Sequence, residues 1–166
     1  MPGRRLPRIV VLLCAGGAAL TGCDAVPSPF AQTVPPPSIR LDDADARVTE
    51  LVEQVSGRPS TTSIDAATRL GCNTGDAGES VGPPYRIRKE WMVDDPDGAL
   101  VSATLTRAAG LTRQDFHRQP WTRPDPEPPG SATYRDAVDY AVTVRAATLP
   151  SGKYVLSVVA TSPCAA

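Results

Sequence analysis

Apolar and polar side chains alternate most regularly in the last part of the chain. Over 138–145 and again over 154–160 every second residue is apolar, and 149–152 between them carries turn-forming residues. The apolar positions are Val138, Tyr140, Val142, Val144, Tyr154, Leu156, Val158 and Ala160. A period of two is typical of strands with one buried face, so the pattern predicts an antiparallel hairpin.

Two earlier segments have the spacing of amphipathic helices. The first, 43–56, begins among aspartates that suit an N-cap and first turn, ends at Gly57, and places its apolar residues at Val48, Leu51, Val52 and Val55. The second, 97–109, ends at Gly110 and is expected to bury Leu100, Val101, Thr104, Leu105 and Ala108. We expect Asp95 to cap this helix, Pro96 to take its first position and Asp97 to face its dipole.

Shorter strands are predicted at 66–72, 85–93 and 112–117. In 85–93 one face carries Tyr85, Ile87, Trp91 and Val93, and the other, facing solvent, carries Arg86, Arg88 and Glu90. Lys89 falls on the apolar face, where we expect its stem to extend the ammonium group to solvent. Glycines predict a long flexible loop over 71–82, and five prolines predict an irregular segment over 119–131.

The order helix, strand, strand, helix and further strands predicts an α+β fold. The expected architecture is a small antiparallel sheet of about four to five strands, covered on one face by two helices. We assign it to one domain that spans residues 39–166.

The first 22 residues have the layout of an export signal. Arg4, Arg5 and Arg8 precede an uncharged apolar run over 9–20, which is too short to cross a bilayer as a helix. Leu20-Thr21-Gly22-Cys23 directly behind it resembles the bacterial lipobox. The resemblance implies that a diacylglyceryl group is attached to the Cys23 sulfur and that a peptidase then cuts before this residue. Cys14 follows Leu13 instead of a small residue, so we do not assign the lipid to it.

An ordinary signal peptide that leaves Cys23 as a plain thiol is the alternative. Residues 23–38 are rich in proline and are expected to be an extended tether between the lipid and the domain. The spacing of Tyr85 and Trp91, the helix, the hairpin and the terminal Ser162-Pro163-Cys164 is similar to that of small actinobacterial cell-envelope lipoproteins of unknown role. That resemblance implies a membrane-anchored, extracytoplasmic location and carries no activity with it.

Charge and cysteine content narrow the classes of partner. The formal net charge is −1, and loss of residues 1–22, with their arginines, makes it more negative, so nucleic acid is excluded as a partner. With Cys14 removed and Cys23 acylated, Cys72 and Cys164 remain and are expected to form one disulfide in an oxidising compartment; two free thiols are the alternative. If the first and last strands are neighbours, this bond links one end of the sheet.

Candidate chemistry is sparse. The two cysteines and the single His117 do not make a zinc site, so no metal or cofactor is expected. Residues 94–98 resemble part of a calcium loop but are better explained as a helix start, and the glycines of 71–82 lack the lysine of a phosphate-binding loop. No nucleophile with an oriented base is recognisable, so we assign no catalytic residue.

These patterns favour a non-enzymatic, lipid-anchored envelope protein that binds a partner or ligand through its sheet face or loops. Two alternatives remain at this point. One is a small cell-wall hydrolase that uses two converging carboxylates, since any two acids can meet in space. The other is a purely structural surface protein.

Overall fold

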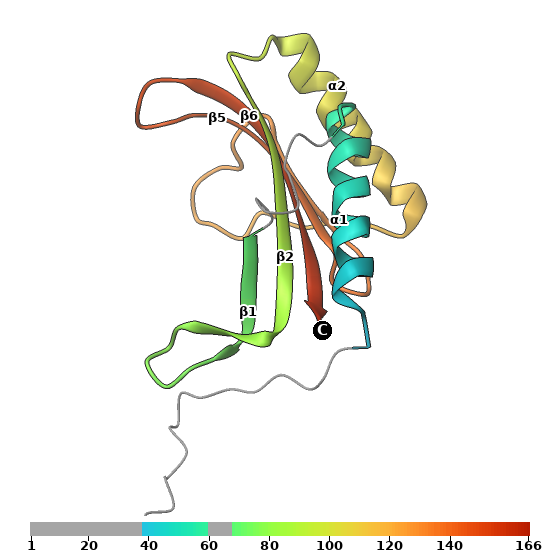
Figure 1. Ribbon diagram of the computed structural model, residues 1–166. Coiled ribbons are helices and arrows are strands. Elements are labelled where there is room, and N and C mark those ends of the chain that lie inside the picture. The colour runs from blue at the N-terminus through green and yellow to red at the C-terminus, as the bar shows by residue number, and fades with distance from the viewer. Residues whose placement is uncertain (1–37, 60–67) are drawn as a thin grey trace, which may run out of the picture.

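The computed structural model describes residues 38–59 and 68–166, in which six antiparallel strands form one sheet covered by two helices on the same face (Figure 1). The strand order is β1-β2-β6-β5-β4-β3. The predicted α+β class is therefore confirmed, and the sheet is larger than the four to five strands expected. The strands are β1 (Thr68–Thr74), β2 (Ser80–Asp94), β3 (His117–Arg118), β4 (Ser131–Arg135), β5 (Ala141–Thr148) and β6 (Tyr154–Ala165).

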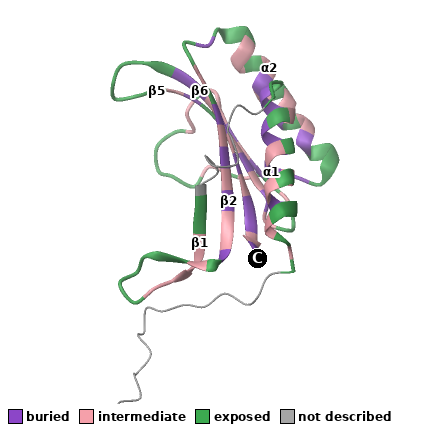
Figure 2. Cartoon of the chain, in the orientation of Figure 1, coloured by how far each residue is buried: buried purple, intermediate pink, exposed green. Residues whose placement is uncertain are grey.

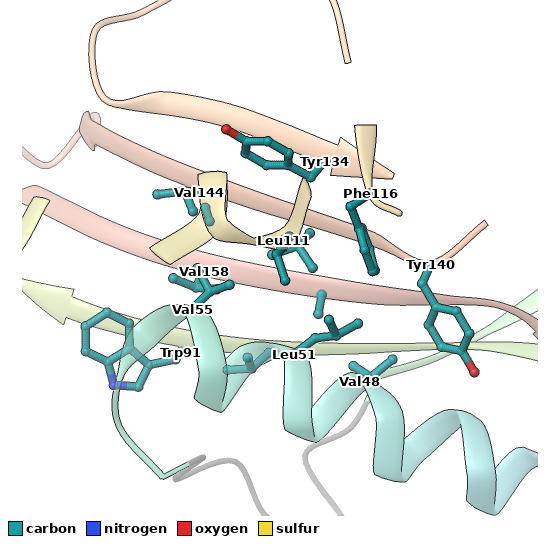
Figure 3. Packing of buried hydrophobic residues seen from close by; sticks show 14 of the residues in the cluster. Val48, Leu51, Val55, Trp91, Leu111, Phe116, Tyr134, Tyr140, Val144 and Val158 are labelled. Carbon is teal, nitrogen blue, oxygen red and sulfur yellow. The ribbon is translucent and has the colours of Figure 1, made fainter. Parts of the chain in front are cut away.

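Helices α1 (Leu41–Ser56) and α2 (Gly98–Ala109) bury their apolar stripes against this sheet. Val48, Leu51 and Val55 of α1 point toward the strands that carry Val144 and Val158 (Figure 3). Figure 2 shows the buried residues gathered between the helices and the central strands. Each fully buried valine or leucine contributes about 1.5–3 kcal/mol, so this layer is the main source of stability.

Helix α1 ends as predicted and begins slightly earlier than expected. Gly57 adopts a left-handed conformation (φ 71°) and donates its N–H to Glu53 O. At the start, Arg40 occupies the N-cap without a side-chain cap, and Asp42 and Asp43 lie in the first turn. Hydrogen bonds from Leu41 N to Ala166 O and from Ala166 N to Ile39 O fasten this end of the helix to the end of β6.

The long glycine loop predicted over 71–82 is wrong. β1 and β2 pair up to Thr74 and Ser80, so only a tight turn separates them, closed by a hydrogen bond from Gly75 N to Glu79 O. Gly71 lies inside β1, where an added Cβ would be 2.1 Å from the backbone of Val81. The glycine there permits the close approach of two strands. In the sequence alone, such a glycine is easily interpreted as part of a flexible loop.

The cap of α2 also differs from the prediction. Asp97, not Asp95, is the N-cap, and its Oδ1 accepts a hydrogen bond from Leu100 N at 2.6 Å. Asp95 lies two residues earlier with φ 47°, and Pro96 is buried ahead of the helix. Thr104 and Ala108 are buried as expected, while Leu100, Val101 and Leu105 are partly buried against the core.

We expect Asp97→Ala to lower the free energy of unfolding by about 1 kcal/mol, because it leaves an N–H of the first turn without its acceptor. Urea denaturation checks this. Asp95→Asn is the control and should have the smaller effect, because Asp95 does not cap the helix and asparagine tolerates the positive φ at this position. An equal loss for both variants would contradict the assignment of the cap.

Several other boundaries move. The strand predicted over 112–117 is mostly the 3₁₀ helix η2 (Gly110–Gln114), with only β3 after it. Val138 is 56% exposed in the turn between β4 and β5, so the alternating run begins later than expected. The Asp136 carboxylate accepts hydrogen bonds from Val138 N and Tyr140 N and holds this turn. Burial, with the nearby Asp136 charge, raises the pKa of the Tyr140 hydroxyl.

Lys89 does not extend its ammonium group to solvent as predicted. Its side chain is 3% exposed, and Nζ donates to Asp45 Oδ2 at 2.8 Å and to Thr49 Oγ1 at 2.6 Å, both on α1. The charge is thus held between sheet and helix by an ion pair and a hydroxyl. Burial of a charge is tolerated under those conditions.

The disulfide between Cys72 and Cys164 is present, with a Cα–Cα distance of 6.1 Å. Its strands are not neighbours, because β2 lies between β1 and β6. Cys72 occupies a break in the β1–β2 register between Gly71 and Asn73, and Cys164 faces Arg86. The bond therefore crosses β2 and links the β1–β2 hairpin to the end of the last strand.

Candidate functional site

One face of the sheet is not covered by helices. Because successive side chains of a strand point to opposite faces, the residues between the core positions of β2, β4, β5 and β6 lie on this open face. From the register they include Arg88, Glu90, Thr133, Thr143, Arg145, Ser157, Val159 and Thr161. The prediction that Arg86, Arg88 and Glu90 lie opposite Trp91 holds, and all three are half-buried.

The irregular proline-rich segment predicted over 119–131 occupies residues 119–130 and lies on the side of the sheet away from α1 and α2 (Figure 1). Its two ends are fastened to the sheet: Gln119 N donates to Thr133 O at 2.8 Å, and Gly130 O accepts from Ala146 N at 3.0 Å. Inside the segment, the Trp121 indole N–H donates to Asp125 O. Five prolines restrict the backbone between these attachments, so the segment is well suited to hold Trp121 in one place.

A hollow of about 200 Å³ opens between this segment and the sheet. Trp121 and Arg123 line it from the segment, and Thr133, Thr143 and Arg145 line it from β4 and β5. A second, more open hollow of about 310 Å³ shares Trp121, Arg123 and Thr133 and extends along β4 to Arg135. Trp121 therefore borders both hollows.

The two arginines of the first hollow are not neutralised by carboxylates. Arg123 lies over the Trp121 ring, 5.4 Å from its centroid, and Arg145 is exposed. Among the residues described by the structure, neither takes part in an ion pair. The one carboxylate in the lining, Glu127, accepts from Arg118 Nη2 at 2.9 Å. The side chains that line the hollow therefore carry a net positive charge, although the net charge of the whole chain is −1.

Hydroxyl and amide groups complete the lining. Thr133 Oγ1 and Thr143 Oγ1 lie 3.1 Å apart in a hydrogen bond. Gln119 donates through Nε2 to His117 O, which leaves its Oε1 as an acceptor. Ser131 Oγ is buried and has no hydrogen-bond partner within the described part of the chain. Such a hydroxyl is costly to leave unsatisfied and often marks a place where a ligand or water binds.

The residues singled out from the sequence are not brought together here. Cys23 and the tether 23–38 lie outside the described residues, apart from Ser38. The Cys72–Cys164 bond lies near the turn end of the β1–β2 hairpin, and His117 is exposed on β3. Trp121, Arg123 and Arg145 were not predicted as a site. The sequence feature that could have indicated this site is the presence of an aromatic residue and an arginine, Trp121 and Arg123, inside a proline-rich segment.

In the parts of the chain that are described, no three His, Cys, Asp or Glu side chains gather closely enough to hold a metal ion. None of the helices in residues 38–59 and 68–166 has the length and apolar character needed to cross a bilayer.

Comparison with known protein families, with curated proteins and with solved structures finds no significant match to this chain.

Proposed function

We propose that this chain is an extracytoplasmic binding protein, held at a membrane by lipid on Cys23, that takes its ligand on the open face of the sheet. The observation that carries the binding role is the hollow between the 119–130 segment and strands β4 and β5. A fixed indole, several hydroxyls and two guanidinium groups without a carboxylate partner among the described residues converge there. Small-molecule sites commonly combine an apolar wall with a few polar groups of this kind.

The location is supported by separate features of the chain. The lipobox-like Leu20-Thr21-Gly22-Cys23 follows an apolar run, and two acyl chains on one sulfur are sufficient for stable anchoring. The Cys72–Cys164 disulfide fits an oxidising compartment outside the cytoplasm. We interpret the leader as that of a membrane protein of the actinobacterial cell envelope, which is palmitoylated or otherwise acylated at Cys23.

A hydrolase with two carboxylates is the second candidate. Such an enzyme needs two acids about 5–10 Å apart at one site. The hollows described above contain a single carboxylate, Glu127, and it is engaged by Arg118. This lining favours binding over hydrolysis at the open face.

Site-specific photocrosslinking tests the proposed binding face. We expect a photoreactive residue at Thr122, which is exposed and lines the second hollow, to give a discrete crosslinked species in intact cells that express the full chain. The matched control is the same residue at Ala46, which is exposed on α1 at the opposite face. Equal labelling from both positions, or none from Thr122, would contradict the assignment. Turnover of a cell-wall substrate by the purified chain would favour the enzyme instead.

A further inference from the structure

We propose that the Trp121 hollow is built for an acidic sugar, that is, a hydroxylated ring that carries a carboxylate. This inference rests on the proposed binding function and adds the chemical class of the ligand. It follows from the charge of the hollow, its hydroxyl and amide lining, its aromatic wall and its size.

The carboxylate is assigned to the guanidinium of Arg145. Arginine presents a planar fork of donors that matches a carboxylate in a bidentate manner. Arg145 is on β5 opposite Ser131 in register, so a rigid strand pair positions its base. It has no carboxylate partner among the described residues, and the nearby Glu127 is already bound to Arg118. An anion that enters the hollow therefore meets an available cation.

The ring hydroxyls are assigned to the neutral polar groups. A sugar hydroxyl both donates and accepts, so it needs both kinds of partner. The Thr133–Thr143 pair shares one hydrogen bond and so retains a free hydroxyl proton and free lone pairs, and Gln119 Oε1 accepts. The buried Ser131 Oγ adds a group that has no hydrogen-bond partner among residues 38–59 and 68–166. A plain fatty acid or aromatic acid would leave these groups unsatisfied at a cost in affinity.

The apolar face of the sugar ring is expected to pack against the indole of Trp121. The face of an indole is electron-rich and attracts weakly positive C–H groups as well as cations. Arg123 lies 5.4 Å from the centroid of this indole and also lines the hollow, so its charge adds to the positive potential there. Because Trp121 borders both hollows, a second sugar unit can extend toward Arg135.

The size supports a small ligand or the end of a chain. A volume of about 200 Å³ is below the range of about 300–1,000 Å³ that is typical of drug-sized sites. A single ring unit fits this description, and the open second hollow leaves room for the remainder of an oligosaccharide. A linear acidic peptide would instead be expected to pair with backbone groups of a strand edge.

The test follows the indole N–H signal of Trp121 by NMR in the mature lipidated protein, held in detergent micelles. The signal is assigned by its loss in Trp121→Phe. Four probes are added separately at millimolar concentration: glucuronate, glucose, cyclohexanecarboxylate and trialanine. We expect glucuronate to shift the signal in a saturable manner and to bind about tenfold more tightly than glucose, which lacks the charge, or cyclohexanecarboxylate, which lacks the hydroxyls.

Two substitutions identify the groups responsible. Arg145→Gln should weaken glucuronate binding by about tenfold or more, and Thr143→Val should weaken it while leaving cyclohexanecarboxylate unaffected. Arg69→Gln, which makes the same change of charge on exposed β1, should leave the affinity unchanged. Equal effects of Arg145→Gln and Arg69→Gln would overturn the assignment of the carboxylate to the hollow.

The remaining outcomes separate this inference from the proposed function. Tighter binding of cyclohexanecarboxylate or trialanine than of glucuronate would overturn the sugar assignment and leave a binding protein with a different ligand. A Trp121 signal that responds to none of the four probes would also overturn it. The proposed function is tested separately: the crosslinking at Thr122 tests the binding face, and the lipid at Cys23 tests the location.

Discussion

Replacement of both Cys72 and Cys164 by serine is expected to lower the free energy of unfolding by about 4–5 kcal/mol. The two residues are 92 positions apart, so the bond removes a large loop-closure entropy from the unfolded chain, and the chain-entropy relation gives this magnitude. In the folded chain the bond holds the β1–β2 hairpin to the end of β6 across β2. Urea denaturation of the mature protein, followed by far-UV circular dichroism, measures the loss.

The control for this experiment is the unmodified protein in excess reductant, which should reproduce the midpoint of the double variant. If the free energy of unfolding falls by less than about 1 kcal/mol, the bond does not restrict the unfolded chain as the entropic account requires. Since each strand next to the bond retains its other pairings, we expect the reduced protein to fold at low temperature.

The second large effect is expected at the buried ion pair between α1 and β2. Asp45→Ala should cost about 3 kcal/mol, because it leaves the Lys89 ammonium buried with Thr49 as its one remaining partner in the described part of the chain. This value is at the lower end for a broken buried pair, since the Asp45 side chain is 23% exposed and water can reach the site. Thermal and urea unfolding measure the change.

Two further variants separate the ion pair from general effects of charge. Asp42→Ala, in the first turn of the same helix and exposed, should cost only about 0.3–1 kcal/mol through the helix dipole. Lys89→Met combined with Asp45→Ala should recover most of the stability, because an apolar side chain then fills the same buried space. A double variant no more stable than Asp45→Ala alone would show that the loss does not come from the unpaired lysine.

Periodicity in the sequence predicted the elements that contain several apolar residues on one face. Helix α1 and the β5–β6 hairpin are of this kind, because Val48, Leu51, Val142 and Val158 recur at the period of their element. Strand β4 was not predicted, since it has only Ala132 and Tyr134 on its buried side and follows a proline-rich segment. Strands β1 and β2 were predicted in part, but their facing ends and the turn between them were mistaken for a long loop, because the glycines there permit close packing.

The partners of polar side chains could not be predicted from spacing. Lys89 was placed on the correct face, but its contacts with Asp45 and Thr49 join residues 44 and 40 positions apart and depend on how α1 crosses the sheet. The residues of the candidate site were even less predictable from spacing. Trp121, Thr143 and Arg145 meet only because an aperiodic segment folds back over β4 and β5. The pairing of Cys72 with Cys164 was predictable because elimination left two cysteines, whereas its crossing of β2 was not.

The central claim is that this chain functions outside the cytoplasm while anchored through one acylated sulfur. Its most direct test is the intact mass and membrane partition of the chain expressed in a bacterial host, compared with a Cys23→Ala variant. We predict that the native form begins at Cys23, carries the added mass of a diacylglyceryl group and sediments with the membrane. The variant should lack this mass and retain residues 1–22, because the peptidase cuts only after acylation. A native chain without the added mass, or a Cys23→Ala chain cleaved at the same position as the native form, would contradict the claim.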